Sequence, residues 1–207
     1  MRFQLSHSLA IVLPLLLTLP NASPNRLALP TTQPAIQGIQ IAALTSQEQA
    51  ALRQGQVLLS GQDGSYTARV MANGSVDTAW TVLTDYDNFA NFLPGVESSQ
   101  LLESSGSQRQ FEQVNVIRIF PITHRERTVI SASETYPSKI AFSQVQGDLR
   151  KLQGAWYITG AGSQVMITHQ VVVEPVSNRG IFFGLYKDNL QKTMAALKQE
   201  IERRSGG

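Results

Sequence analysis

The segment Leu83 to Val96, which reads Leu-Thr-Asp-Tyr-Asp-Asn-Phe-Ala-Asn-Phe-Leu-Pro-Gly-Val, constrains the fold of this chain more than any other. It closes an amphipathic helix that Ser75 is placed to cap. After a sharp turn, a second short helix rich in Phe begins, and Pro94-Gly95 ends it. The apolar face of the first helix recurs at three- and four-residue spacing, at Val76, Ala79, Trp80, Leu83 and Tyr86.

A long β region follows this helical pair. It consists of six segments without helical periodicity, separated by breaks rich in Gly, Ser and Pro. The predicted strands lie near residues 96–103, 109–120, 125–134, 140–146, 152–159 and 164–174. A first stranded region, 56–60 and 65–72, follows a short helix over 46–54 with Ser46 as its cap. Short turns between consecutive strands predict an antiparallel meander.

The last long segment, residues 180–204, has the period of an amphipathic helix. Its apolar stripe contains Tyr186, Leu190, Met194, Leu197 and Ile201. This stripe needs an apolar partner, and the concave face of the sheet is the large apolar surface that remains. We therefore predict an α+β helix-grip fold: a curved antiparallel β-sheet wrapped around a long C-terminal helix, with two short helices after the first stranded region.

The N-terminus has a different character from the rest of the 207 residues. Arg2, a short apolar run broken by Pro14, and the small residues after Pro20 predict a signal peptide over residues 1–23. A Pro/Thr/Gln-rich linker over 24–45, a domain over 46–204 and a tail over 205–207 complete the predicted organisation. We expect export to a periplasm or an equivalent lumen, and an uncleaved leader that anchors the chain to a membrane is the alternative.

Composition narrows the classes of partner. The formal net charge is +2, and the basic residues are interleaved with acidic ones, so no nucleic-acid partner is expected. The absence of cysteine means that stability comes from the packed core rather than from disulfides. Nothing in the sequence indicates an oligomeric state.

With these elements placed, residues 61–204 resemble the START-like (SRPBCC) superfamily, in its polyketide cyclase/dehydrase and coenzyme Q-binding branch. The resemblance rests on residues 79–86, with Phe89, Phe92, Leu93 and Pro94 after them. It also rests on Gly147-Asp148-Leu149, on Gly154-Ala155-Trp156, and on Asn189-Leu190 and Ala195-Ala196-Leu197 in the last helix. It implies a cavity for lipids, quinones, polyketides or similar apolar molecules, and it does not imply one activity.

Several side chains are candidates for lining such a cavity. His169 shares the apolar alternation of the last strand, where it contacts either a ligand or only neighbouring strands. The face with Phe111, Gln113 and Asn115 mixes apolar and amide side chains, which fits either a hollow interior or a wetted surface. The aromatic residues near 89–93 and 181–185 form either a gate that touches a membrane transiently or ordinary core. The candidate ligand-binding residues are Phe89, Phe92, Leu93, Phe111, Asn115, Ile117, Trp156, Ile167, His169, Phe182 and Phe183.

The usual parts of an enzyme are missing from the sequence. Asp85 and Asp87 are interpreted as structural residues that hold the kink and cap the second short helix. No metal-ligand set, phosphate loop or nucleophile elbow occurs, so no catalytic residue, metal or cofactor is expected. The favoured hypothesis is a non-enzymatic carrier of a lipid, isoprenoid or quinone-like molecule. An aromatase/cyclase-type enzyme and a ligand-free interaction module are the alternatives.

Overall fold

The computed structural model describes residues 44–119, 122–177 and 179–206. The predicted signal peptide and almost all of the predicted linker lie outside these residues. The first described helix is α1 (Ser46–Arg53), and its cap is Thr45 rather than the predicted Ser46. The Thr45 hydroxyl accepts from the Glu48 amide at 3.2 Å, and the Glu48 carboxylate accepts from the Thr45 amide at 2.8 Å. This reciprocal capping box places the N-cap one residue before the expected one, and the helix itself begins at Ser46.

A hairpin and two short helices come next. Strands β1 (Leu58–Gln62) and β2 (Ser65–Asn73) are joined by Asp63 and Gly64, whose φ angles of 51° and 89° suit a tight hairpin turn. The predicted kinked pair is α2 (Val76–Leu83), one turn of 3-10 helix η1 (Tyr86–Asn88) and α3 (Phe89–Phe92). Ser75 caps α2 as expected, since its hydroxyl accepts from the Thr78 amide at 3.0 Å.

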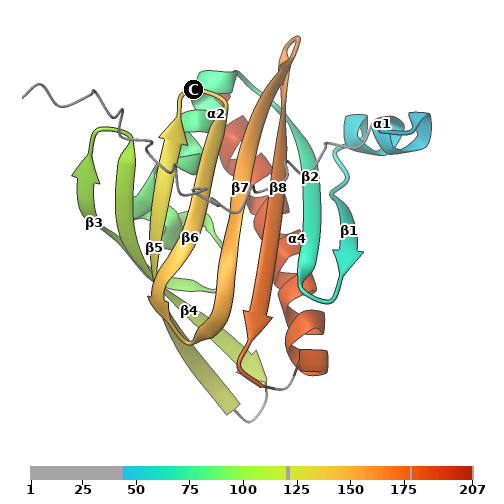
Figure 1. Cartoon of the computed structure of the whole chain (residues 1–207). Coiled ribbons are helices and arrows are strands. Elements are labelled where there is room, and N and C mark those ends of the chain that lie inside the picture. Colours follow the sequence, from blue (N-terminus) through green and yellow to red (C-terminus); the bar gives the residue numbers. More distant parts are fainter. Residues whose placement is uncertain (1–43, 120–121, 178, 207) are drawn as a thin grey trace, which may run out of the picture. The chain divides into compact units, whose positions relative to one another are not determined.

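Six more strands complete one antiparallel sheet. They are β3 (Val96–Ser105), β4 (Gln108–Ile119), β5 (Ile122–Thr135), β6 (Lys139–Gly147), β7 (Leu149–Ala161) and β8 (Gln164–Pro175). The order across the sheet is β1-β2-β8-β7-β6-β5-β4-β3, so β8 returns to pair with β2 (Figure 1). The meander is therefore confirmed, and the early hairpin extends it at one edge.

The long helix α4 (Arg179–Ser205) lies behind the sheet in Figure 1 and packs mainly against β2. Four members of its predicted stripe, Leu190, Met194, Leu197 and Ile201, are buried, whereas Tyr186 is half-buried. The facing side chains of β2 include Ala68 and Ala72, which are fully buried and short, so the helix can approach this part of the sheet closely. The helix-grip architecture is confirmed.

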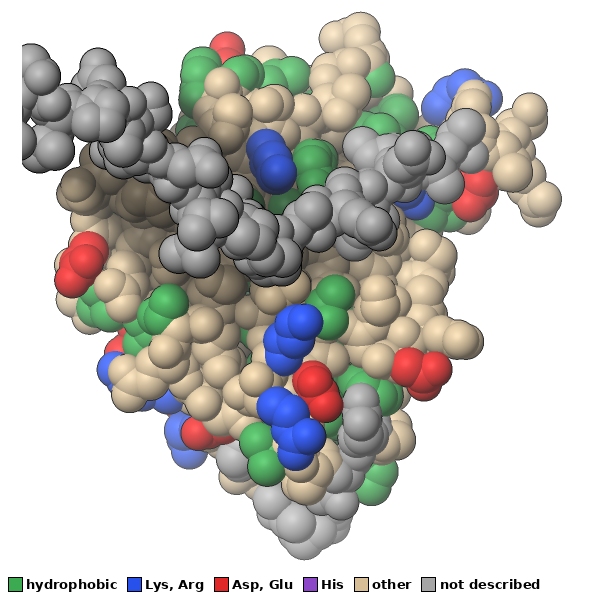
Figure 2. Space-filling view, viewed as in Figure 1, with side chains coloured by type: hydrophobic (Ala, Val, Ile, Leu, Met, Phe, Trp, Pro, Cys, Tyr) green, Lys and Arg blue, Asp and Glu red, His purple; other side chains and the backbone are tan. Residues whose placement is uncertain are grey.

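The opposite face of the sheet carries mixed charges. Figure 2 shows Lys and Arg side chains lying close to Asp and Glu side chains among uncharged polar groups, over the part of this face that is described. No helix within the described parts of the chain is both long enough and apolar enough to cross a bilayer.

Candidate ligand-binding cavity

A cavity of about 360 Å³ lies between the concave face of the sheet and the helices. Most of its lining is apolar, and it draws on α2, η1, α3, α4 and strands β3 to β8. This volume falls in the range of small-molecule sites. The apolar lining residues include Leu83, Phe89, Leu93, Val96, Phe111, Ile130, Ala132, Ile140, Phe142, Leu149, Leu152, Trp156, Phe182, Leu185, Leu190 and Leu197.

One wall of the cavity is an aromatic stack, defined here as Phe142, Trp156 and His169. The rings of Trp156 and His169, which are cross-strand partners, have centroids 3.7 Å apart, and the Phe142 and His169 centroids are 5.5 Å apart. Gly154 makes room for this stack, because a Cβ atom at its position would lie 2.9 Å from Cζ of Phe142. The stack therefore offers flat apolar surface to a ligand.

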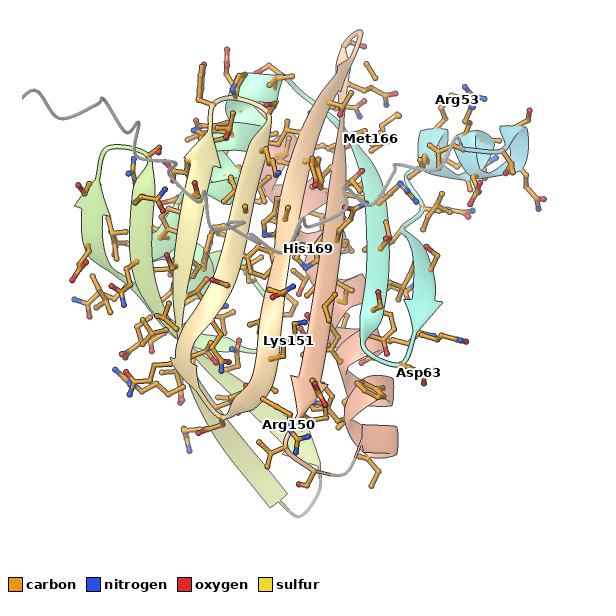
Figure 3. All side chains as sticks on the ribbon, in the orientation of Figure 1. Arg53, Asp63, Arg150, Lys151, Met166 and His169 are labelled. Carbon is orange, nitrogen blue, oxygen red and sulfur yellow. The ribbon has the colours of Figure 1, made fainter. Side chains whose placement is uncertain are left out.

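His169 lies on β8 (Figure 3). Burial lowers the pKa of its imidazole to about 3, because the charged form loses its hydration. Its Nδ1 atom has no hydrogen-bond partner among the described residues. A buried polar nitrogen beside a cavity is able to hydrogen-bond a ligand that enters there.

The kinked helical pair closes the cavity over β4 and β5. Tyr86 stacks on Phe111 at 4.6 Å between ring centroids, and its hydroxyl donates to Glu134 at 2.8 Å. Glu134 also forms an ion pair with Arg109 at 3.0 Å. Burial and the bond to Glu134 both raise the pKa of Tyr86, so this hydroxyl stays protonated and acts as a donor.

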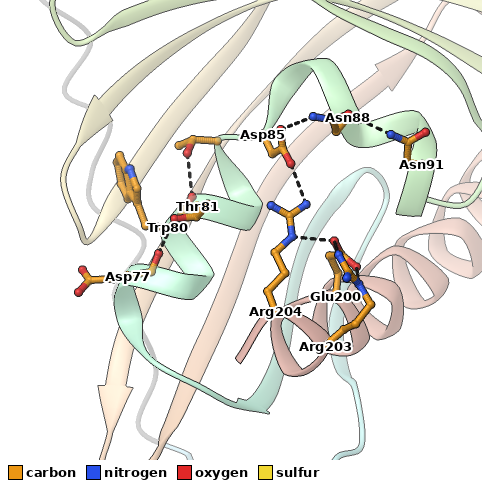
Figure 4. Close-up of polar contacts among 10 residues, drawn as sticks. Asp77, Trp80, Thr81, Asp85, Asn88, Asn91, Glu200, Arg203 and Arg204 are labelled. Carbon is orange, nitrogen blue, oxygen red and sulfur yellow. Dashed lines mark hydrogen bonds and ion pairs between the residues drawn. The ribbon is translucent and has the colours of Figure 1, made fainter. Parts of the chain in front are cut away.

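A polar cluster, which we call the clasp, ties the kink to the end of α4 (Figure 4). One Asp85 carboxylate oxygen accepts from Asn88 and the other from Arg204, each at 2.7 Å. Arg204 also donates to Glu200 at 2.7 Å. Asp85 therefore holds the kink, as predicted. The expectation that Asp87 caps α3 is wrong, because its carboxylate accepts from the Leu101 amide of β3 at 2.7 Å.

The cavity reaches the surface between the α3–β3 turn and α4. The lining residues that are exposed mark this mouth: Gly95, Leu185, Asp188, Asn189 and Lys192. The side-chain amide of Asn189 donates to the Pro94 carbonyl at 3.4 Å across it. The Gly95 carbonyl accepts from the Val116 amide at 2.7 Å, which fixes the other side of the turn to β4.

Seven of the eleven candidate ligand-binding residues line this cavity: Phe89, Leu93, Phe111, Asn115, Trp156, His169 and Phe182. Three lie elsewhere. Phe92 packs against the Arg204 guanidinium, Ile167 is fully buried in the core, and Phe183 lies near Gly64 in the β1–β2 turn. The side chain of Ile117 is outside the described residues.

The mixed face of β4 borders the interior where it is described, since Phe111, Gln113 and Asn115 all line the cavity. Strand register places Ile130, Thr128 and Glu126 of β5 directly beside these three residues, and they line the cavity as well. These three β5 residues are not among the candidates that the sequence predicts. The sequence shows that they alternate along one strand with Ala132. That they lie beside Phe111, Gln113 and Asn115 follows only from the register between β4 and β5, which the sequence does not contain.

Among the described residues, no group of three or more His, Asp and Glu side chains is placed to hold a metal ion. Several polar residues line the cavity, and they are His169, Tyr86, Tyr186, Gln113, Asn115, Glu126 and Thr128, together with Asp188, Asn189, Lys192 and Thr193 of α4. Such a set can hydrogen-bond an organic molecule and fix its orientation.

Solved structures of other proteins share this fold. A STAR-related lipid transfer protein from Xanthomonas axonopodis superposes with a TM-score of 0.60 at 16% identity, over 70% of this chain and 92% of that one. The Zhui aromatase/cyclase from a Streptomyces species gives a TM-score of 0.57 at 17% identity, over 67% of this chain and 93% of that one. A protein from Thermus thermophilus gives a TM-score of 0.57 at 15% identity, over 67% of this chain and 94% of that one.

Sequence comparison gives the family. A comparison with curated protein sequences found no match. The family model described as "Polyketide cyclase / dehydrase and lipid transport" matches residues 73–195, which include the kinked helices, β3 to β8 and most of α4. Because this match spans more than half of the 207 residues, the chain belongs to the polyketide cyclase/dehydrase and lipid transport family.

Proposed function

We propose that this protein binds an apolar small molecule, such as a lipid, an isoprenoid or a quinone-like compound, and stores or transfers it unchanged. The cavity of about 360 Å³ carries this proposal, because apolar side chains from the sheet and from α2, α3 and α4 surround it. Burial of apolar ligand surface, at about 25 cal/mol per Å², supplies affinity without any catalytic group.

The state of His169 favours binding over proton transfer. A general base works best when its pKa is near the working pH, and burial takes the pKa of His169 to about 3. The fold also occurs in an aromatase/cyclase, so chemistry in such a cavity is the competing proposal. Here the imidazole is better suited to hydrogen-bonding and stacking on a ligand than to taking a proton from it.

The proposal includes transient contact with a membrane during loading or release. Val176 and Ile181, near the start of α4, are 63% and 67% exposed, and Leu185 is both exposed and part of the cavity lining. Apolar side chains at this position favour contact with lipid close to the mouth. The predicted leader is compatible with this role, since export fits lipid handling at a membrane.

The test is to fill the cavity. Ala132 lines it, whereas Ala141, on the adjacent strand β6, does not, so Ala132→Leu and Ala141→Leu form a matched pair. We expect the purified protein to carry or take up an apolar molecule that native mass spectrometry and extraction recover unchanged. Ala132→Leu is expected to weaken its binding at least tenfold and Ala141→Leu less than twofold.

Fluorescence gives a second readout. Trp156 lines the cavity and the second tryptophan, Trp80, packs against Tyr136, so a Trp80→Phe background reports on the cavity alone. Ligand is expected to change the emission of Trp156 in proportion to occupancy. Failure of lipids, isoprenoid alcohols and quinones alike to bind would contradict the proposal, and recovery of a chemically altered ligand would favour the enzyme.

A further inference from the structure

A second wall of the cavity is polar, and nothing in a purely apolar ligand would use it. We call this the polar wall and define it by Gln113 and Asn115 of β4 with Glu126 and Thr128 of β5. All four line the cavity, and the register pairs Gln113 with Thr128 and Asn115 with Glu126. Two neighbouring cross-strand pairs on one face therefore present amide, hydroxyl and carboxylate groups together.

Three of these side chains, those of Gln113, Asn115 and Thr128, are not occupied in holding the fold together. Within the described part of the chain, the side chains of Gln113, Asn115 and Thr128 make no hydrogen bond to another residue. Yet Thr128 is 2% exposed and the Gln113 and Asn115 side chains are half-buried. A polar group that is partly shielded from water and has no protein partner is unfavourable, so residues of this kind in a cavity wall point to a polar group on the ligand.

The chemistry of the wall selects that group. The Gln and Asn amides and the Thr hydroxyl both donate and accept, while a carboxylate such as that of Glu126 only accepts. The negative charge of Glu126 is felt within the cavity, since it adds to burial in raising the pKa of the Tyr186 hydroxyl on α4. A ligand hydroxyl, which both donates and accepts, satisfies this set better than a carbonyl, which only accepts.

The position of the wall sets the orientation of the ligand. Asn115 pairs with Val96, which lies just after the turn at the mouth, so the polar wall is next to the opening. The aromatic stack runs from Phe142 on β6, next to β5, to His169 on β8, which is three strands beyond β5 or about 14 Å at the usual strand spacing. An elongated molecule thus spans from the polar wall to the stack.

From this arrangement we infer that the ligand is an amphiphile with a hydroxyl at one end. Its hydroxyl lies against Gln113, Asn115, Glu126 and Thr128 near the mouth, and its apolar end lies against Phe142, Trp156 and His169. This inference rests on the proposed binding function and narrows its ligand class to alcohols of isoprenoid or similar chains.

The experiment compares molecules that share one carbon skeleton. Farnesol, farnesal and farnesene are titrated into the purified full-length chain, by displacement of the fluorescent probe 1-N-phenylnaphthylamine and by native mass spectrometry. We expect farnesol to bind at least tenfold more tightly than farnesene, which corresponds to one or two hydrogen bonds, and more tightly than farnesal.

Variants locate the source of the preference. Gln113→Leu combined with Thr128→Val is expected to reduce the farnesol preference to threefold or less while farnesene binding is kept or improved. The matched control is Gln110→Leu with Ser131→Ala, a pair on the same two strands that does not line the cavity. If the double variant does not fold, Thr128→Val alone, a nearly isosteric change, is expected to halve the preference or more.

The outcomes separate the two proposals. Equal binding of farnesol and farnesene by the unmodified chain, farnesal binding as tight as farnesol, or a preference that survives the polar-wall variants overturns the hydroxyl inference and leaves the binding function standing. Absence of binding for all three molecules, together with lipids and quinones, overturns both.

Discussion

The neutral imidazole of His169 makes stability depend on pH in a predictable window. Its pKa is about 3 in the folded chain and 6.5 in an unfolded chain, so only the unfolded state takes up a proton as the pH falls below 6.5. Proton uptake by the unfolded state lowers the free energy of unfolding. From pH 8 to pH 5 we expect the loss due to this residue to be about 2 kcal/mol, measured by urea unfolding.

His169→Phe supplies the comparison, because it keeps an aromatic ring in the stack and removes the titrating group. The variant is expected to lose about 2 kcal/mol less than the unmodified chain over the same pH range. Glu200 does not interfere with this comparison. Its bonds to Arg203 and Arg204 lower its pKa from 4.5 to about 2, so its effect on the free energy of unfolding appears mainly below pH 5. If the free energy of unfolding falls by the same amount with pH in both proteins, His169 is not buried as described.

Two glycines illustrate how space decides the effect of one methyl group. A Cβ atom on Gly154 would lie 2.1 Å from the Gln170 carbonyl oxygen, whereas one on Gly184 of α4 meets nothing within 4 Å. We expect Gly154→Ala to lower the free energy of unfolding by about 2–3 kcal/mol, because the strand backbone must shift. Gly184→Ala is expected to raise it by up to about 1 kcal/mol through helix propensity. Chemical denaturation of both variants checks the signs, and a Gly154→Ala protein of unchanged stability would refute the close approach.

At the scale of elements, the clasp predicts how strongly the kink is held to α4. Arg204 is 22% exposed at its side chain and bonds both Asp85 and Glu200. Arg204→Ala leaves both carboxylates without this partner, so we expect a loss of about 2–3 kcal/mol in urea unfolding. The control on the same helix is Lys192→Ala, which breaks the pair with Asp188, where both side chains are 63% exposed. That change is expected to lower stability by less than about 0.5 kcal/mol, and equal effects of the two substitutions would contradict the role of the clasp.

The sequence predicts the elements of this fold well because their signals are local. Ser75 marks a helix start, Pro94-Gly95 ends one, and the 3.6-residue stripe defines α4. Contacts between elements follow from register and docking, which no local pattern contains. For that reason Thr128 and Glu126 were missed although Asn115 was found, and Phe92 was assigned to a cavity that it does not line. The same limit applies to Asp87, whose partner is the amide of Leu101, fourteen residues away.

At the scale of the whole molecule, α4 serves the sheet in two ways. Met194 and Ile201 are fully buried in the main core, while Leu185, Asn189 and neighbouring residues of the same helix border the cavity. The helix therefore packs tightly on one part of the sheet and stands away from another, so core and cavity share one scaffold. An apolar stripe in a sequence indicates contact with the sheet, but the unfilled volume depends on curvature and on side-chain sizes across several strands.

An interior with unfilled space also makes the folded chain sensitive to hydrostatic compression. Unfolding removes such voids, so it lowers the volume of the system and is promoted by pressure, in proportion to the void that disappears. Ala132→Leu, which occupies part of the roughly 360 Å³, is expected to raise the midpoint pressure of unfolding followed by tryptophan fluorescence, and Ala141→Leu to leave it unchanged. Identical midpoints for both variants would mean that the interior is already filled. In the expected case, a bound guest molecule protects the fold from compression by completing its packing.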